Sequence, residues 1–172
     1  MIVTIIAATA ENKALGKNND LVWDLPADMQ FFKDTTRGHA VITGRRNYES
    51  IPEKYRPLKG RTNIVVSNNP NYPAPGAVVV TDLQNALQVA EKQGESEVFI
   101  IGGGQIYALA LEEKVVDKMY LTHVHGEFDA DVFFPHFDPI SWTKEEVLYH
   151  PADEKHACAF TIFKYLRKKE TV

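Results

Sequence analysis

The chain has little cysteine, no excess of positive charge and no long apolar run, and each lack excludes a class of protein. Cys158 is the only cysteine among 172 residues, which excludes an intramolecular disulfide and a cysteine-based metal cluster. Lys and Arg number 19 against 23 Asp and Glu. The resulting net charge of -4 argues against a nucleic-acid-binding domain, because phosphate contacts need a basic surface. We therefore expect no nucleic-acid partner.

Segments that would direct the chain to a membrane are also missing. The apolar run from Ile2 to Ala8 is far too short to span a bilayer, and it lacks the basic start of a signal peptide. No repeat, low-complexity stretch or linker divides the 172 residues, a usual length for one domain. We expect a single domain over residues 1–172, cytoplasmic, monomeric and without a membrane partner.

The alternation of apolar and amphipathic segments predicts the fold class. We predict strands at residues 2–8, 39–43, 62–67, 77–80, 97–101 and 118–124, and helices at residues 26–36, 45–51 and 105–111. A further helix begins at a cap, Thr81 or Asp82, and ends before Gly94, with an apolar stripe of Leu83, Ala86, Leu87 and Ala90. This order indicates an α/β protein with a mostly parallel sheet.

Two segments depart from the alternation of strands and helices. Residues 10–22 are polar and rich in Asn and Gly, and we read them as one long loop, a feature that is usually functional in a compact domain. Residues 145–149 and 157–166 read as two strands with no helix between them. This pair predicts an antiparallel hairpin at one edge of the sheet.

Asp28 is the most informative side chain in the first predicted helix. Pro26 is favoured in a first helical turn. The helix face that carries Asp28 then also carries Phe31, Phe32 and Thr35, and its phenylalanines indicate that it points inward. A carboxylate there loses hydration and becomes a candidate for proton chemistry near neutral pH. The alternative is an acidic residue that serves the helix dipole.

Two predicted strands end at glycines that are followed directly by a helix. Backbone N–H groups at such a helix start bind phosphate when no side chain is in the way, and residues 102–104 are all glycine. After Gly44, Arg45 and Arg46 occupy a first turn, where the helix dipole disfavours cations unless an anion is bound. The alternatives are a tight turn that needs glycine and two solvated arginines.

Further polar residues flank the strand predicted at residues 62–67. Ser67 and Asn68 lie at its end, where ligands usually bind in open α/β sheets. Arg61 precedes the strand, and arginine can bind a carboxylate through two hydrogen bonds. Turn chemistry and a surface salt bridge are the alternatives. Together with Asp28, these features outline one cleft for phosphates and a carboxylate.

Histidine and cysteine offer no competing chemistry. The six histidines are scattered along the chain. His123 and His125 fit alternate residues of a strand better than a metal pair. We therefore expect no metal site.

The order and spacing of these motifs resemble those of the dihydrofolate reductase family from Ile2 to about Lys168. The motifs are Trp23-x-Leu25-Pro26-Ala27-Asp28, Gly44-Arg45, Glu49-Ser50-Ile51, Pro57-Leu58-x-Gly60-Arg61, Ile101-Gly102-Gly103-Gly104 with Tyr107, and Tyr120-Leu121-Thr122-His123. The resemblance implies a single-domain, mostly parallel eight-stranded mixed sheet with flanking helices and a C-terminal antiparallel hairpin. It also implies an oxidoreductase that reduces 7,8-dihydrofolate to 5,6,7,8-tetrahydrofolate with NADPH, by hydride transfer to C6 and protonation of N5, in support of one-carbon metabolism.

The resemblance assigns roles to individual residues. In catalysis, Asp28 would hold the pterin and promote protonation of N5, Thr122 would support Asp28, Trp23 would hold a water and Leu21 would close over the nicotinamide. The substrate pocket would be formed by Ile6, Ala8, Asp28, Met29, Phe32, Ser50, Ile51, Leu58, Ile101, Tyr107 and Thr122, with Arg61 on the α-carboxylate of the glutamate tail. NADPH would contact Ala7, Leu15, Gly16, Gly44, Arg45, Arg46, Asn47, Ser67, Asn68, Gly102, Gly103, Gly104, Gln105, Ile106 and Tyr107. The Gly102-Gly103 peptide bond would be cis.

Two alternatives to this function remain open. A related reductase could act on another pterin or a pyrimidine, since a riboflavin-pathway reductase shares the fold, although Arg61 and the Asp28 helix speak against it. A non-catalytic nucleotide-binding module would need neither Asp28 nor Thr122. Three features depart from the family's pattern. Val22 stands in place of a common proline, Asn47 stands in place of the usual threonine, and Lys54-Tyr55-Arg56 comes from a slightly longer connection before Pro57.

Overall fold

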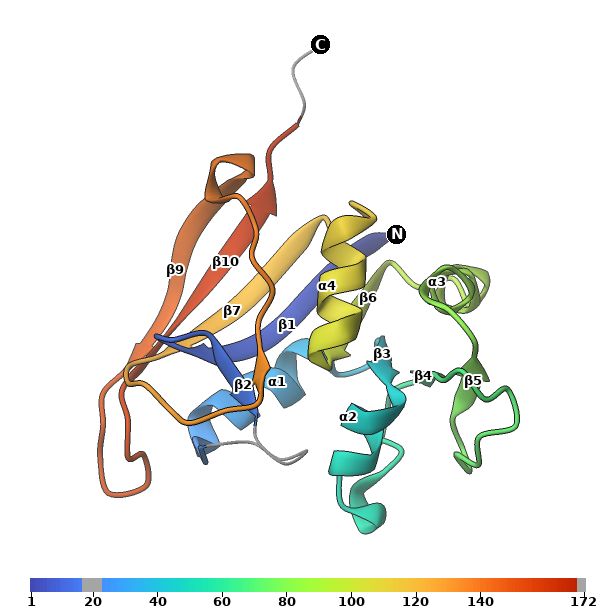
Figure 1. The fold of residues 1–172 in the computed structure, drawn as a ribbon, viewed down its shortest axis with the longest axis horizontal. Coiled ribbons are helices and arrows are strands. Elements are labelled where there is room, and N and C mark those ends of the chain that lie inside the picture. Colours follow the sequence, from blue (N-terminus) through green and yellow to red (C-terminus); the bar gives the residue numbers. More distant parts are fainter. Residues whose placement is uncertain (17–22, 170–172) are drawn as a thin grey trace.

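An eight-stranded sheet forms the centre of the structure (Figure 1). The computed structural model describes residues 1–16 and 23–169. Across the sheet the strand order is β5-β4-β3-β6-β1-β7-β10-β9. The bounds are β1 (Ile2–Ala10), β3 (Ala40–Gly44), β4 (Asn63–Val66), β5 (Val78–Val80), β6 (Glu97–Gly102), β7 (Lys118–Val124), β9 (Trp142–His150) and β10 (Phe160–Arg167).

The directions of the strands confirm the predicted fold class. Every neighbouring pair from β5 to β7 is parallel. In contrast, β10 runs antiparallel to both β7 and β9, and β9 forms the edge of the sheet. The C-terminal hairpin therefore lies at one edge, as the sequence predicts.

Helices cover both faces of the sheet, because the parallel strands are apolar on both sides. Alternate residues of one strand point to opposite faces, so neighbouring residues of β1 enter different clusters. Ile5 packs in a core with residues of α3 (Leu83–Lys92) and α4 (Gly104–Glu112). Ile6 packs in a second cluster with Phe31 and Phe32 of α1 (Pro26–Thr36). Each fully buried aliphatic side chain stabilises the fold by about 1.5–3 kcal/mol.

Local signals place the helices close to their predicted bounds. The helix α1 spans the predicted range, and α2 (Arg45–Ser50) ends one residue early. Asp82, rather than Thr81, is the N-cap of α3, and its side chain accepts a hydrogen bond of 2.7 Å from the Asn85 N–H. Gly94, just past that helix, has a φ of 76°, which suits glycine.

The prediction of one long loop at residues 10–22 is wrong for its described part. The strand β1 continues to Ala10, and β2 (Ala14–Gly16) follows it. The latter pairs antiparallel with β8 (Val132–Phe133) in a separate two-stranded sheet. A strand of three residues is too short to show the alternation of a β-strand in its sequence, and its partner β8 lies far along the chain. Residues 17–22 lie outside the described residues.

Two short 3-10 helices, η1 (Glu53–Tyr55) and η2 (Pro139–Ser141), complete the elements. The peptide bond between Gly102 and Gly103 is cis, as the resemblance suggests, and so is the bond between Arg56 and Pro57. Within residues 1–16 and 23–169, no helix is long and apolar enough to cross a membrane.

Candidate active site

A cleft of about 740 Å³ opens at the carboxyl ends of the central parallel strands. Its walls come from α1, from the ends of β1, β4 and β6, and from the first turns of α2 and α4. Ligands of open α/β sheets usually bind at this position, because the loops there diverge and leave a crevice. The candidate motifs from distant parts of the sequence meet in this cleft.

Asp28 extends from the first turn of α1 into the cleft and is held by Thr122 of β7. The Thr122 hydroxyl donates a hydrogen bond of 2.6 Å from Oγ1 to Asp28 Oδ1. Protein atoms surround the carboxylate on most sides, although the residue keeps part of its exposure toward the cleft. Burial raises the pKa of Asp28 because it disfavours the charged form, and the hydrogen bond from Thr122 opposes this rise.

The helix face that carries Asp28 forms a wall of the cleft and is not part of the densely packed core. Asp28, Phe31, Phe32 and Thr35 are all partly buried, whereas Thr36 on the neighbouring stripe is fully buried. The ring of Phe31 packs edge-on against Tyr120, with 5.5 Å between the centroids. The inward orientation is confirmed, but these aromatic side chains border an open space. Helical periodicity does not distinguish a core from a cleft.

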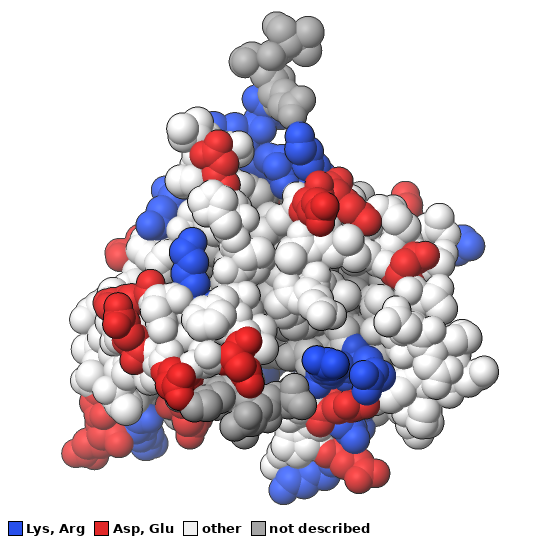
Figure 2. Space-filling model, viewed as in Figure 1, with Lys and Arg blue, Asp and Glu red and all other residues white. Residues whose placement is uncertain are grey.

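Every residue that the resemblance assigns to NADPH lines the cleft, and we call the part that these residues form the cofactor half. These are Ala7, Leu15, Gly16, Gly44, Arg45, Arg46, Asn47, Ser67, Asn68, Gly102, Gly103, Gly104, Gln105, Ile106 and Tyr107. Figure 2 shows basic side chains over α2, beside a hollow in the surface. An anionic ligand would find cations at this side of the cleft and apolar walls at the other.

The glycines at the helix starts fit a phosphate-bearing dinucleotide. Gly103 is the N-cap of α4, and the first bond of that helix runs from Tyr107 N–H to the Gly103 carbonyl at 3.1 Å. The N–H groups of the turn before Tyr107 are therefore without an acceptor inside the helix. A Cβ on Gly44 would lie 3.1 Å from Ile106 and 3.8 Å from the Gly103 nitrogen. A side chain at position 44 would therefore press against Ile106 and enter the space between the two helix starts.

Asn47, which replaces the family's usual threonine, is directed toward the sheet. Its Nδ2 donates to Thr43 Oγ1 at 3.0 Å and to the Ile101 carbonyl at 3.4 Å. These bonds connect α2 to the ends of β3 and β6. Asn47 therefore supports the cofactor side of the cleft by joining the two elements that carry the glycines.

Tyr107 connects the two halves of the cleft. Its ring is buried, and its hydroxyl donates a hydrogen bond of 2.8 Å to the Ile6 carbonyl. Burial raises the pKa of Tyr107, so this hydroxyl stays protonated and keeps its role as a donor. The bond fixes the first turn of α4 against the middle of β1.

The structure brings most of the predicted substrate residues into the cleft. Ile6, Ala8, Asp28, Met29, Phe32, Ser50, Ile101, Tyr107 and Thr122 all line it. Three predicted residues lie outside its lining. Ile51 packs against a cluster around Tyr48, Leu58 packs against a cluster that includes Phe31 and Phe32, and Arg61 follows a turn farther along the chain.

Arg61 is anchored by α1 and by its own turn. Nε donates to Thr36 Oγ1 at 2.8 Å, Nη1 to the Lys59 carbonyl at 2.5 Å and Nη2 to the Lys33 carbonyl at 3.0 Å. A guanidinium has five N–H groups, so these bonds within the described residues leave one N–H on each terminal nitrogen. A guanidinium can bind a carboxylate through two hydrogen bonds of this kind.

The structure describes only one of the two remaining catalytic candidates, Trp23. Trp23 lines the cleft, and its ring packs against Phe128 with centroids 5.4 Å apart. Leu21 lies outside the described residues, as does Val22.

Sequence reasoning missed some residues of the cleft and one cluster outside it. Phe31, Val66, Thr81, Asp82, Leu109 and Val132 also line the cleft. Of these residues, only Phe31 could be expected from the sequence, because it lies on the same helix face as Asp28. Val132 enters through the unpredicted strand β8. Two histidines that we read as scattered, His150 and His156, meet at Asp153 near the start of α1.

Known proteins are similar in sequence to this chain over nearly its whole length. The sequence profile of the family described as dihydrofolate reductase matches residues 2–167. The chain is 43% identical over 162 residues to dihydrofolate reductase type 3 of Salmonella typhimurium, covering 93% of this chain and 96% of that relative. It is 36% identical over 170 residues to the dihydrofolate reductase of Bacillus subtilis (strain 168), covering 99% and 97%.

A solved structure gives the same result for the fold. The dihydrofolate reductase from Enterococcus faecalis, complexed with NADP(H) and RAB-propyl, superposes with a TM-score of 0.88. The two chains are 33% identical, and the match covers 98% of this chain and 97% of that one.

Proposed function

Because the chain belongs to the dihydrofolate reductase family, we propose that its cleft performs the family's reaction with Asp28 as the central catalytic residue. The reaction is the NADPH-dependent reduction of 7,8-dihydrofolate to 5,6,7,8-tetrahydrofolate, in folate and one-carbon metabolism. The observation that carries the assignment of Asp28 is its place in the cleft, partly buried and hydrogen-bonded to Thr122.

The cofactor half of the cleft holds NADPH through backbone and side-chain donors. When bound, NADPH supplies the hydride that is added to C6 of the pterin. The open N–H groups at the start of α4 and the cations of α2 would hold the phosphates. Arg45, together with Ser67 and Asn68, would surround the 2′-phosphate. Ala7, Leu15 and Gly16 would form the floor at the nicotinamide end.

Asp28 acts on the pterin as a partly buried acceptor with a raised pKa. Its carboxylate would accept hydrogen bonds from the pterin amino group and ring N–H, and these bonds fix the orientation of the ring. Its raised pKa also lets it hold a proton closer to neutral pH than an exposed aspartate can. A proton would reach N5 from this region through water, which Trp23 would hold beside the site. Thr122 keeps the carboxylate in place.

Residues around the rim complete the pocket. Ile6, Ala8, Met29, Phe32, Ser50, Ile51, Leu58, Ile101 and Tyr107 would form its apolar and polar walls. We propose that Leu21, outside the described residues, closes over the nicotinamide. Arg61 would bind the α-carboxylate of the glutamate tail with the two N–H groups that its contacts leave available.

We further propose that the enzyme is a single-domain cytoplasmic monomer without nucleic-acid or membrane partners. The net charge of -4 and the lone Cys158 support this proposal, because nucleic acid needs a basic surface and secreted domains often carry disulfides.

Asp28→Asn should keep the fold and NADPH binding but lower turnover with dihydrofolate by about 10²–10⁴-fold at neutral pH. The substitution keeps the shape and removes the ionisable group. Turnover is followed by loss of NADPH absorbance, and NADPH binding by fluorescence. Asp34→Asn, on the exposed side of the same helix, is the matched control and should remain active. Turnover of Asp28→Asn close to that of the wild type would refute the assignment.

Arg61→Lys should weaken dihydrofolate binding and leave NADPH binding unchanged. Lysine keeps the charge but cannot bind a carboxylate with the geometry of a guanidinium. A dihydropterin without the glutamate tail provides the control, because its KM should not respond to the substitution. An equal rise of both KM values would show that Arg61 acts through its contacts to Thr36 and the two lysine carbonyls.

Arg45→Ala should reduce the preference for NADPH over NADH by roughly tenfold or more. A charge-assisted hydrogen bond contributes about 1.5–3 kcal/mol, and the 2′-phosphate is the only difference between the two cofactors. Arg45 Nη1 also pairs with Glu49 Oε1 at 3.0 Å. Glu49→Gln is therefore the control, since it removes this partner and keeps the cation. The measurement is the ratio of kcat/KM for the two cofactors, and an unchanged ratio in Arg45→Ala would place the 2′-phosphate elsewhere.

A further inference from the structure

The loop between β9 and β10 reaches across to the first turn of α1. The Ala27 N–H donates a hydrogen bond of 3.0 Å to Nε2 of His156, a residue more than one hundred positions later in the chain. Ala27 is in the first turn of α1, where N–H groups have no acceptor inside the helix. The N-cap residue, Leu25, provides no side-chain acceptor. His156 therefore supplies a cap that the helix itself lacks.

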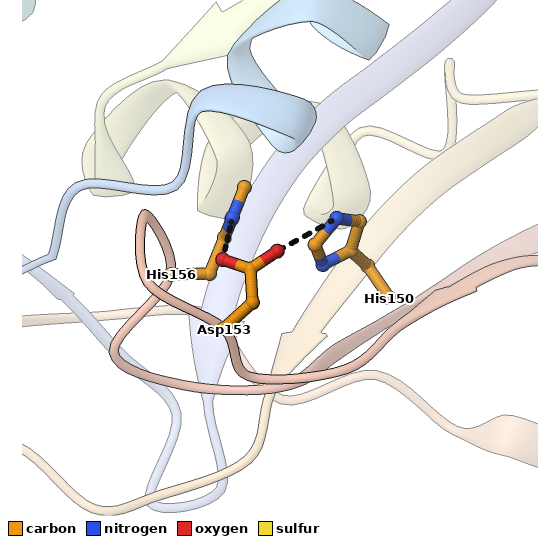
Figure 3. A group of neighbouring side chains, drawn as sticks. All are labelled: His150, Asp153 and His156. Atoms are coloured by element: carbon orange, nitrogen blue, oxygen red, sulfur yellow. Dashed lines mark hydrogen bonds and ion pairs between the residues drawn. The ribbon is translucent and has the colours of Figure 1, made fainter.

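The hydrogen bonds of His156 define its tautomer. Nε2 accepts from an N–H group and so carries a lone pair, which places the single proton of a neutral imidazole on Nδ1. Nδ1 lies 2.8 Å from Asp153 Oδ1, to which it donates (Figure 3). The same oxygen accepts a bond of 2.9 Å from the Lys155 N–H. Asp153 thus fixes the ring orientation and the tautomer that α1 requires.

Packing holds the imidazole in place. Only 5% of His156 is exposed. Its ring lies against that of His150, with centroids 4.1 Å apart, and His150 stacks on Phe160 at 5.3 Å. Phe160 is fully buried in a cluster with Leu25 and Ala27. The loop and the start of α1 therefore share one apolar cluster around the polar contact.

His150, Asp153 and His156 also resemble a metal-binding group, since one ligand atom from each lies within 4.8 Å of the others. A metal ion on Nδ1 of His156 would move the ring proton to Nε2. Nε2 would then become a donor facing the Ala27 N–H, another donor. Metal binding there and the contact with α1 exclude each other, and the observed contact has the lone pair on Nε2.

We propose that His156 is a positioning residue for the reduction of dihydrofolate, acting as a cap supplied to α1 from the distant hairpin. Ala27 directly precedes Asp28, so the bond to His156 fixes the turn from which the carboxylate reaches Thr122. Without the cap, the first turn of α1 loosens and the carboxylate moves relative to the pterin. This inference rests on the role proposed for Asp28.

Two substitutions of His156 separate the acceptor from the ring. His156→Gln places an amide oxygen near the position of Nε2 and keeps the acceptor, whereas His156→Phe keeps the aromatic packing and loses it. His150→Phe is the matched control, because it keeps the ring stack and loses only the ion pair of 3.8 Å between His150 Nε2 and Asp153 Oδ2 and the contact of Nδ1 with the Pro151 carbonyl. Within the described residues, His150 makes no hydrogen bond to α1. Hydride transfer is measured in a single turnover, along with the KM for NADPH and the hydrogen exchange of the Ala27 amide.

We expect His156→Phe to slow hydride transfer by roughly two- to thirtyfold. This is the factor that results when the free energy of a typical helix cap is added to the barrier for hydride transfer. The Ala27 amide should exchange faster, and the KM for NADPH should not change. His156→Gln and His150→Phe should stay near the wild-type rate. Equal losses in His156→Gln and His156→Phe, or a wild-type rate in His156→Phe, would overturn the proposal. Failure of the role of Asp28 is distinguishable, because Asp28→Asn would then remain active whatever the His156 variants do.

Discussion

Thr122 Oγ1 donates a hydrogen bond of 2.6 Å to Asp28 Oδ1, and this bond joins the two elements that place the acid in the cleft, α1 and β7. Two effects act on the carboxylate in opposite directions. Burial raises its pKa, and the bond from Thr122 lowers it. The pKa of Asp28 is higher in the folded protein than in the unfolded chain. Ionisation of Asp28 therefore lowers the free energy of unfolding at neutral pH. The cost disappears as the pH falls below the pKa of the unfolded chain. The carboxylate to which we assign the catalytic role therefore weakens the fold at neutral pH.

The rest of the cleft surrounds this carboxylate with residues of α1, α2 and α4 and of the sheet. On one side, Gly44 and the glycines before α4 leave two helix starts open to phosphate. Asn47 connects α2 to the ends of β3 and β6, the strands that lead to these glycines. On the other side, α1 presents a partly buried aromatic face. The first turn of α1 has no side-chain cap of its own, and the acceptor comes from His156 in the C-terminal hairpin. The antiparallel edge of the sheet thus contributes to the geometry of the parallel centre.

The sequence allowed prediction of those features that depend on local pattern. The bounds of α1 followed from Pro26 and the spacing of Asp28 with the phenylalanines, and the edge hairpin followed from two strands without a helix between them. That these glycines and arginines line one cleft followed from their places at helix starts, together with the family resemblance, while their contacts to NADPH stay a prediction. Contacts between distant short segments could not be predicted, as for β2 with β8 and His156 with Ala27. Periodicity also could not show that the Asp28 face borders a cleft.

Burial and the hydrogen bond from Thr122 together set the pKa of Asp28, and direct titration of this carboxylate tests their effects. The ¹³C chemical shift of the Asp28 carboxyl carbon should be followed against pH in the wild type and in Thr122→Val, which keeps the shape and removes the donor. We expect a midpoint above the ordinary aspartate value of about 3.9 in the wild type and a still higher midpoint in Thr122→Val. A wild-type midpoint at or below the ordinary value, or a lower one in Thr122→Val, would contradict it.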